Sequence, residues 1–352
     1  MAIVTDADAT RAAASRGAAT VTGSTATGTT VAGPAPAPLP RPEATQPVVV
    51  DMEQVIGLSL LHLVALAAFI PWCFSWTGVT AAIVGHFLFG MCGITIGYHR
   101  LLTHRGFVCP RWFERVLAVL GMCTLQGSPA RWVATHRVHH RESDEQPDPH
   151  SPLAGFFWGH TGWLLVRHRN LDRTGSYERY VRDLLRDRFY LEMERHDMWF
   201  FVYLAHAVAL VAIGAAIGWW TGGAAEAVRL AVSMAVWGVA LRTVVVLHGT
   251  WAVNSLSHTW GYRNYQTTDN SRNNWLVALL AHGEGWHNNH HADQRAAAHG
   301  HRWWEFDMSW WVIRSLEAVG LVSDVVRPRA WNPARRPVTG PGAILDAFDG
   351  DE

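Results

Sequence analysis

Histidine is concentrated in four short clusters of this sequence. The nine clustered residues are His99, His104, His136, His139, His140, His258, His287, His290 and His291. In the triplets that begin at His136 and His287, the histidines stand at positions i, i+3 and i+4, which share one face of an α-helix. Asn254 stands four residues before His258, so these two side chains also share a helix face. Neutral imidazole binds transition metals, and the pattern therefore predicts a metal site.

The number of histidines bears on the number and kind of metal ions. Nine imidazoles are too many for one ion, whereas two ions with four or five ligands each would use them all. The cysteines lie outside the clusters, which argues against structural zinc and against an iron–sulfur cluster. The Glu and Glu-x-x-His ligands of soluble di-iron bundles are not the pattern seen here. Two redox-active iron ions fit best, and ligand type alone leaves zinc open.

Four long apolar runs come in two pairs, one before the first histidine cluster and one before the third. They cover residues 55–74, 79–97, 198–220 and 230–253, and each is near the roughly 20 residues that a helix needs to cross a bilayer. Only 16% of the chain is charged, below the roughly 25% of ordinary soluble proteins. Short linkers join the first pair of runs and the second pair. The sequence therefore predicts an all-α integral membrane protein with four transmembrane helices, arranged as two hairpins, and a cytoplasmic helical cap that holds a di-metal centre.

The distribution of arginine predicts the orientation in the membrane. All basic residues are arginine, and the two hairpin loops contain one of them, Arg229. The segments 100–195 and 263 onward are rich in arginine, and the positive-inside rule places them, the histidines and both termini in the cytoplasm. The lack of lysine indicates a GC-rich coding sequence, hence a bacterial cell membrane. A formal net charge of zero gives no sign of a nucleic-acid partner.

Composition divides the chain into three parts. Residues 1–50 are rich in Ala, Thr, Gly and Pro and are predicted to form a disordered tail. Residues 51–330 are predicted to form the membrane domain, and residues 331–352 a C-terminal tail.

An ordered set of motifs then points to a family. The motifs are Gly97-Tyr98-His99-Arg100, Trp132 with the His136 triplet, Asp148-Pro149-His150, Gly155-Phe156-Phe157 with His160-Thr161-Gly162-Trp163-Leu164-Leu165, and Gly283-Glu284-Gly285-Trp286-His287. Together they resemble the membrane fatty-acyl desaturases of the stearoyl-CoA type. The resemblance implies that the nine histidines are ligands of two iron ions and that Asn254 holds a water on one of them. It implies an O2-dependent desaturase that introduces a cis double bond, at Δ9, into a saturated acyl chain.

The sequence indicates the group that carries the acyl chain less clearly than it indicates the reaction. Trp132 and Gln126 are predicted to line the acyl tunnel beside the metals. Animal acyl-CoA members of the family have an Arg-Asp pair directly before the histidine triplet, which helps to recognise the CoA headgroup, and this chain has Ala134-Thr135 there. Acyl-CoA is the leading substrate, and acyl-lipid and acyl-carrier protein remain open.

The electrons must come from a partner. The chain shows neither a His-Pro-Gly-Gly haem motif nor a cysteine set for a ferredoxin domain. We expect a separate ferredoxin or cytochrome b5-like donor with a flavin reductase. Two other functions compete: a hydroxylase, ketolase or acetylenase on the same scaffold, and a histidine-rich metal transporter. A transporter would need polar residues along a path across the bilayer, whereas the clusters lie beyond the spans at one face.

Polar residues outside the clusters complete the predictions. Glu284 and Asp148 are expected to accept the second N–H of ligating histidines. Arg242 lies inside the fourth apolar run, where a charge needs either a function or a buried partner. The remaining histidines are interpreted as satisfied polar or surface residues, although His248, six residues before Asn254, could lie near the metals.

Overall fold

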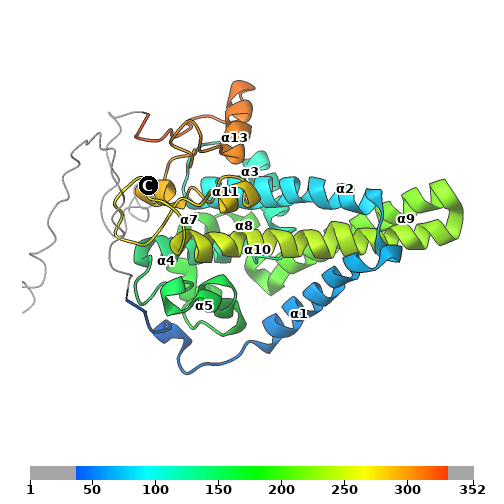
Figure 1. Cartoon of the computed structure of the whole chain (residues 1–352), viewed down its shortest axis with the longest axis horizontal. Coiled ribbons are helices and arrows are strands. Elements are labelled where there is room, and N and C mark those ends of the chain that lie inside the picture. The colour runs from blue at the N-terminus through cyan, green and yellow to red at the C-terminus, as the bar shows by residue number, and fades with distance from the viewer. Residues whose placement is uncertain (1–36, 332–352) are drawn as a thin grey trace, which may run out of the picture. The chain divides into compact units, whose positions relative to one another are not determined.

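The computed structural model describes residues 37–331, and its regular elements there are helices, with strand pairing limited to isolated bridges (Figure 1). The α-helices are α1 (Met52–Leu66), α2 (Trp76–Gly85), α3 (Arg111–Met122), α4 (Pro129–Glu142), α5 (Phe156–His160), α6 (Thr174–Tyr177), α7 (Arg182–Leu185), α8 (Arg188–Glu194), α9 (Met198–Ser233), α10 (Arg242–Ser255), α11 (Trp275–Leu280), α12 (His287–Ala292) and α13 (Met308–Ala318). Two π-helical segments, η4 (His86–Thr103) and η9 (Met234–Leu241), continue α2 and join α9 to α10. The prediction of an all-helical chain is confirmed for the described residues.

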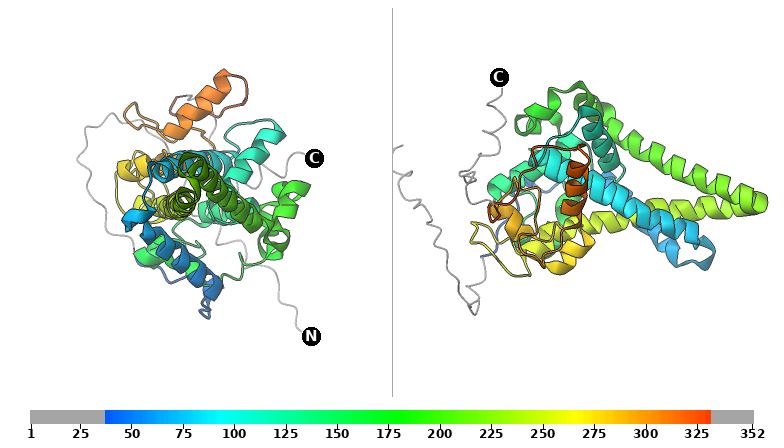
Figure 2. Two further views of the ribbon diagram at one scale, coloured as in Figure 1. Left: turned by 90° about the vertical axis from the view of Figure 1, so that its right-hand side faces the viewer. Right: turned by 90° about the horizontal axis from the view of Figure 1, so that it is seen from above.

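Three helical stretches are long and apolar enough to cross a membrane: Met52–Phe69, Trp76–Thr103 and Arg188–His258. The third has 71 residues and reverses direction at Gly223, whose φ of 74° and ψ of −160° are not helical. On either side of the turn, Gly218 lies directly against the backbone of Glu226 and Ala227. Figure 2 shows the outgoing and returning arms joined at the tip of the hairpin and diverging toward the rest of the molecule. The predicted hairpin of the third and fourth apolar runs is therefore present as two antiparallel helical arms.

The first apolar run differs from its predicted boundaries. A continuous helix over 55–74 was expected, but α1 ends at Leu66 and two 3₁₀ turns, η2 (Ala67–Phe69) and η3 (Pro71–Cys73), follow it. Proline has no N–H and disfavours helical geometry in the residue before it, and Ile70 is accordingly extended, with φ −84° and ψ 118°. The second run, by contrast, stays helical beyond its predicted end at residue 97. His99 consequently lies inside a helix.

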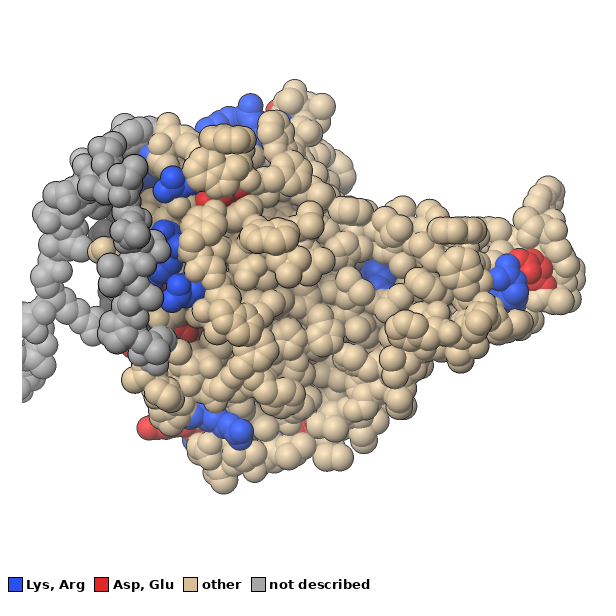
Figure 3. Space-filling model, viewed as in Figure 1, with Lys and Arg blue, Asp and Glu red and all other residues tan. Residues whose placement is uncertain are grey.

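The surface of these stretches is apolar. In α1, Leu60 and Leu63 are 56% and 62% exposed, and only 6% of the residues in the Met52–Phe69 stretch are buried. Large exposed apolar surfaces are unfavourable in water and fit contact with lipid. In Figure 3, charged side chains gather at the cap end and at the far tip of the hairpin, with an almost uncharged surface between them.

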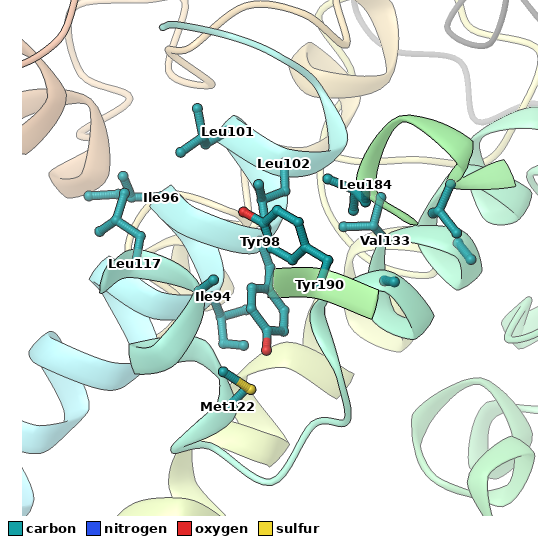
Figure 4. Packing of buried hydrophobic residues seen from close by; sticks show 14 of the residues in the cluster. Ile94, Ile96, Tyr98, Leu101, Leu102, Leu117, Met122, Val133, Leu184 and Tyr190 are labelled. Atoms are coloured by element: carbon teal, nitrogen blue, oxygen red, sulfur yellow. The ribbon is translucent and has the colours of Figure 1, made fainter. Parts of the chain in front are cut away.

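A buried hydrophobic cluster fixes the two helices that carry the first histidines. It brings together Ile94 and Tyr98 of η4, Leu117 of α3, Val133 of α4 and Tyr190 of α8 (Figure 4). The glycines at positions 93 and 121 allow η4 and α3 to touch, because a Cβ on the first would overlap the backbone of the second. This packing holds η4 beside α4.

Residues 37–50 were predicted to belong to a disordered tail, but they pack along the segment 153–169. The Leu39 N–H donates to the Leu153 carbonyl at 3.0 Å, Val50 forms an isolated bridge with Val166, and Thr45 is 2% exposed. The proline-rich composition of this segment gave no indication of these backbone hydrogen bonds. The remaining parts of the predicted tails, residues 1–36 and 332–352, lie outside the described residues.

Candidate metal centre

The nine clustered histidines come together in two buried groups. The five-histidine group contains His99, His104, His136, His140 and His290, and the four-histidine group contains His139, His258, His287 and His291. Within each group, one nitrogen of every member lies within 4.8 Å of the others. The sizes of the groups agree with the expectation of four or five ligands for each of two ions.

Helix periodicity explains how the triplets divide between the groups. In α4, His136 and His140 are one turn apart and enter the five-histidine group, while His139 enters the other. In α12 the division is reversed, because His287 and His291 enter the four-histidine group and His290 the other. Each of the two helices therefore supplies histidines to both groups, which places the groups next to each other.

Four of the clustered histidines have a carboxylate partner on their second nitrogen. The Nδ1 atoms lie 2.6 to 3.0 Å from carboxylate oxygens in the pairs His99–Glu284, His139–Asp148, His258–Asp144 and His291–Asp269. An Nδ1–H that donates to a carboxylate leaves the Nε2 lone pair free for a metal. The predicted partners Glu284 and Asp148 are thus found in place.

Sequence reasoning missed Asp144 and Asp269. Both lie in loops, where no helical spacing relates them to the histidines that they contact. It also missed two further buried imidazoles. The ring centroid of His150 lies 4.4 Å from that of His139, and the centroid of His299 lies 4.3 Å from that of His290. Both were expected to be satisfied polar or surface residues, but both are buried, with ring nitrogens that have no hydrogen-bond partner.

The convergence of lone pairs shows that the four-histidine group fits a cation. His287 Nε2 lies 3.0 Å from His258 Nε2 and 3.1 Å from His291 Nε2, and both of those rings donate through Nδ1. A single N–H on His287 could satisfy at most one of the two lone pairs. A shared metal ion would satisfy all of them, because transition metals bind the free lone pair of neutral imidazole.

The five-histidine group has the same character. His290 Nε2 lies 3.1 Å from His99 Nε2 and 2.9 Å from His140 Nε2. Both nitrogens of His104 are buried without a hydrogen-bond partner. Buried polar atoms seldom remain unpaired, and a bound cation accounts for one nitrogen of His104.

The electrostatics of the site favour neutral histidines and ionised acids. Burial lowers the pKa of His136, His140 and His290 well below the usual value, and neighbouring imidazoles lower it further. For Asp269, burial alone would raise the pKa, but His291 and His258 outweigh it, and the pKa lies below the usual range. Metal ligation requires neutral imidazole, so these three rings are in the form that binds. For His258, burial alone would lower the pKa, but Asp144 outweighs it, and the pKa is raised.

Glu284 joins the five-histidine group to the rest of the cap. Its carboxylate contacts His99, His299 and the fully buried Arg100, whose Nη2 lies 3.0 Å away. Arg100 Nη1 also donates to Asp307 at 2.9 Å. The neighbouring glycine at 283 has a φ of +111°, and a Cβ there would overlap the Asp307 carboxylate. The Gly-Glu-Gly motif is therefore needed to bring Glu284 to the site.

Comparison with known proteins supplies the deciding observation. The model of the fatty acid desaturase family matches residues 74–321, which include all nine histidines. The chain belongs to the fatty acid desaturase family. It is 42% identical over 265 residues to an sn-1 stearoyl-lipid 9-desaturase of Anabaena variabilis, covering 75% of this chain and 90% of that protein.

Two further relatives show the range of substrates in the family. An sn-1 stearoyl-lipid 9-desaturase of Synechocystis sp. is 40% identical over 268 residues, with 76% of this chain and 78% of that protein covered. An icosanoyl-CoA 5-desaturase of Limnanthes douglasii is 40% identical over 280 residues, with 79% and 73% covered. This desaturase is therefore an oxidoreductase of fatty acyl chains, and its histidine groups point to a metal centre.

The predicted substrate residues of the desaturase lie beside the five-histidine group. The Trp132 ring stacks on His136 with centroids 5.1 Å apart and an interplanar angle of 27°. Its Nε1–H donates to Gln126 Oε1 at 3.2 Å, and Gln126 Nε2 donates to Thr250 Oγ1 at 3.1 Å. The hydrogen-bonded row Trp132–Gln126–Thr250 links α4 to α10 next to the candidate ligands.

Asn254 is buried on α10, one turn before His258. This position fits the expected water ligand, which stays a prediction. Arg242, also on α10, has found buried partners: it donates to the Cys123 carbonyl at 2.7 Å and to His206 Nε2 at 2.6 Å. Its guanidinium also lies over the Phe89 ring, 4.6 Å from the centroid. These contacts tie α10 to its neighbours within the desaturase.

Proposed function

We propose that this desaturase uses O2 to introduce a cis double bond, at Δ9, into a saturated acyl chain, with two iron ions held by the nine histidines. The two groups of converging Nε2 atoms carry the proposal, because they offer neutral, buried ligands for two ions at adjacent positions. When bound, two irons supply the oxidising power drawn from O2 that removal of hydrogen from unactivated methylenes requires. The overall reaction takes two electrons and two protons and releases two water molecules.

The chain itself positions and shields the reacting groups. The four carboxylates orient four of the rings, and burial keeps water away from the site. We assign the acyl chain to the side of the five-histidine group where Trp132 and Gln126 lie. Asn254 would hold a water on the ion of the four-histidine group, since it precedes His258 by one helical turn.

Two observations favour an acyl-lipid over acyl-CoA as the substrate. Ala134 is fully buried, and the Thr135 hydroxyl donates to the Arg131 carbonyl of its own helix at 2.9 Å. Neither residue offers a charge to a CoA phosphate. The relatives from Anabaena and Synechocystis are named for stearoyl-lipid, whereas the Limnanthes relative is named for icosanoyl-CoA. We therefore propose an acyl-lipid substrate, with acyl-CoA and acyl-carrier protein as the alternatives.

For the membrane arrangement, we propose four spans in two hairpins, with the cap and both termini in the cytoplasm of a bacterial cell. The exposed apolar surfaces of α1 and the Gly223 hairpin support the spans. The arginine-rich cap supports the orientation. A separate ferredoxin or cytochrome b5-like protein with its reductase is proposed as the electron donor, since basic surfaces attract acidic carriers.

Product analysis tests the function. The chain would be expressed in a desaturase-deficient host together with a ferredoxin and its reductase, and fatty-acid methyl esters would be identified. A new monounsaturated acid is expected, absent with His139→Ala and retained with His196→Gln, which changes an exposed histidine outside the groups. A hydroxylated product would assign the chain to the hydroxylase alternative. Absence of any product with the donor supplied would overturn the proposal.

A second assay identifies the carrier. Purified enzyme would be offered stearoyl-CoA, stearoyl-carrier protein and a stearoyl glycerolipid in separate reactions. Turnover of the glycerolipid alone is expected. Turnover of the CoA thioester in place of the lipid would show that the cap binds phosphate through residues other than Ala134 and Thr135.

A further inference from the structure

The histidine triplet of α12 contains two asparagines, Asn288 and Asn289, and both side chains are completely buried. The Asn288 Oδ1 atom accepts the backbone N–H groups of Asn264 and Tyr265, each at 2.8 Å, and Asn288 Nδ2 donates to the Tyr265 carbonyl at 3.0 Å. The Asn289 Oδ1 atom accepts from Asn264 Nδ2 at 2.8 Å. The two asparagines therefore attach the segment 262–273 to the helix that supplies histidines to both groups.

A buried carboxylate completes this attachment. Glu305 is 4% exposed, and its Oε1 atom accepts from the Tyr262 hydroxyl at 2.7 Å and from Asn264 Nδ2 at 2.6 Å. Its Oε2 atom accepts from Asn289 Nδ2 at 2.7 Å and from the backbone N–H groups of residues 301 and 302 at 2.7 and 2.9 Å. A buried charge is costly unless hydrogen bonds compensate for it, and these five donors do so. Glu305 thus joins α12, the segment 262–273 and its own loop at one point.

The segment 262–273 reaches the four-histidine group at two places. The Asp269 carboxylate lies 2.8 Å from His291 Nδ1. The backbone N–H of the next residue, Asn270, donates to Asp144 Oδ2 at 2.7 Å, and the same oxygen lies 2.9 Å from His258 Nδ1. The position of this segment therefore determines how two of the orienting carboxylates face their histidines.

The five-histidine group depends less on this segment. Its carboxylate, Glu284, lies outside the segment and is held by Arg100 at 3.0 Å. The helix α12 supplies only His290 to the five-histidine group, whereas it supplies His287 and His291 to the other. A displacement of the segment 262–273 should consequently disturb the four-histidine group more than the five-histidine group.

We propose that Glu305 is a positioning residue of the metal centre. Through Asn289 and Asn264 it fixes the segment 262–273 on α12, and it thereby orients Asp269 and Asp144 toward the four-histidine group. This inference rests on the proposed function, because it takes the four-histidine group to be a metal site. The carboxylate is specifically required, since both of its oxygens only accept. A glutamine in its place would turn an NH2 group toward at least two of the five donors.

The test measures iron binding by wild type, Glu305→Gln and the control Glu178→Gln, which changes an exposed glutamate. Each purified protein would be loaded with ferrous iron and titrated with a chelator, and the iron that remains on each chain would be counted. We expect Glu305→Gln to release one of its two irons at a roughly tenfold lower chelator concentration than wild type. This is the lower end of the loss that follows removal of an outer partner, because Glu305 acts through other residues. The other iron, and both irons of Glu178→Gln, should be released as in wild type.

Two further measurements separate positioning from a general loss of stability. Excess ferrous iron should restore the kcat of Glu305→Gln at unchanged KM, whereas a misfolded chain would gain nothing from added iron. Asn264→Asp removes the Nδ2–H donors to Asn289 and Glu305 at constant side-chain size, and it should show the same selective release of one iron. Equal release of both irons, or wild-type affinity in both variants, would overturn the proposal. A wild-type chain that binds no iron would instead count against the proposed function.

Discussion

The two histidine groups hold their members in different ways. In the four-histidine group, His139, His258 and His291 each donate to a carboxylate. In the five-histidine group, His99 donates to Glu284, whereas His104 has no hydrogen-bond partner on either nitrogen. A ring held by a second hydrogen bond is oriented before any metal arrives. We therefore expect metal binding by the four-histidine group to depend on the hydrogen bonds that orient its rings. Metal binding by the five-histidine group should depend more on the number of its histidines.

The groups also differ in their surroundings. The five-histidine group lies beside the Trp132–Gln126–Thr250 row, and His258 of the four-histidine group follows Asn254 by one helical turn. Under the proposed function, one group thus has residues suited to an acyl chain, and the other has a residue suited to hold water. Substitutions that affect one group and spare the other test this division.

Removing a ligand should give the largest effect and should differ between the groups. His287→Ala leaves three histidines in its group and removes the ring whose Nε2 contacts two others. We expect its iron content to fall from about two to about one per chain, and product formation to fall a hundredfold or more, beyond what loss of an outer partner costs. His104→Ala leaves four histidines and should retain more iron. Metal analysis and methyl-ester analysis measure both, and equal iron loss in the two variants would contradict the comparison.

Removing one orienting carboxylate should give a smaller loss. Asp269→Asn keeps the size of the side chain but weakens the acceptor for His291 Nδ1–H, which lies 2.8 Å away. Iron affinity should fall about 10- to 100-fold, as is usual when such a partner is lost. Competition with a chelator measures the affinity, and Asp324→Asn, at an exposed position, is the matched control. Unchanged affinity in Asp269→Asn would mean that packing alone orients the ring.

The candidate ligands could be predicted because helix geometry relates residues close in sequence. The i, i+3, i+4 triplets at His136 and His287 required only the 3.6-residue repeat. Asp269, in contrast, is 22 residues from His291, and its place follows from a loop that no local pattern specifies. The hydrogen bond from Asn264 to Glu305 likewise joins residues 41 positions apart. Sequence thus indicated the candidate ligands, and the structure added the carboxylates that orient them.

The fold likewise has features that the sequence predicted and features that it did not. The apolar runs indicated helices because burial and membrane contact both require long hydrophobic stretches. The break after α1 had a local signal in Pro71, whereas the packing of residues 37–50 on the cap had none. Backbone hydrogen bonds such as that from Leu39 to Leu153 place few demands on side-chain type, so composition does not reveal them.

The helix shared by the two groups should show a moderate, pH-dependent effect. Arg137 of α4 points away from the metal ligands, and its Nη1 donates to Asp183 of α7 at 2.8 Å. Burial alone would raise the pKa of Asp183, but Arg137 and Arg105 lower it to about 2. Since the folded pKa is below the unfolded value of about 3.9, the stabilisation, about 2 kcal/mol, is present above pH 4 and is lost as pH falls toward 2.

Thermal unfolding as a function of pH measures this contribution. Asp183→Asn should be less stable than wild type at pH 7, with a smaller difference near pH 2. The proposed function predicts that both histidine groups lose iron together in this variant, since α4 supplies ligands to each. Loss of iron from one group alone would show that the two groups do not depend on α4 equally.

The smallest effect is expected beside the five-histidine group. Trp132→Phe keeps an aromatic ring against His136 but removes the N–H that donates to Gln126. The Gln126 oxygen is only half-buried and water can replace the lost donor, so kcat/KM should fall only about two- to fivefold, with iron content unchanged. Because the altered residue lies on the proposed substrate side, the variant should also shift the double-bond position or the preferred chain length. Gas chromatography of the products measures this shift. A loss of iron with unaltered products would instead make Trp132 a support for His136, and would remove the proposed division between an acyl-chain side and a water side.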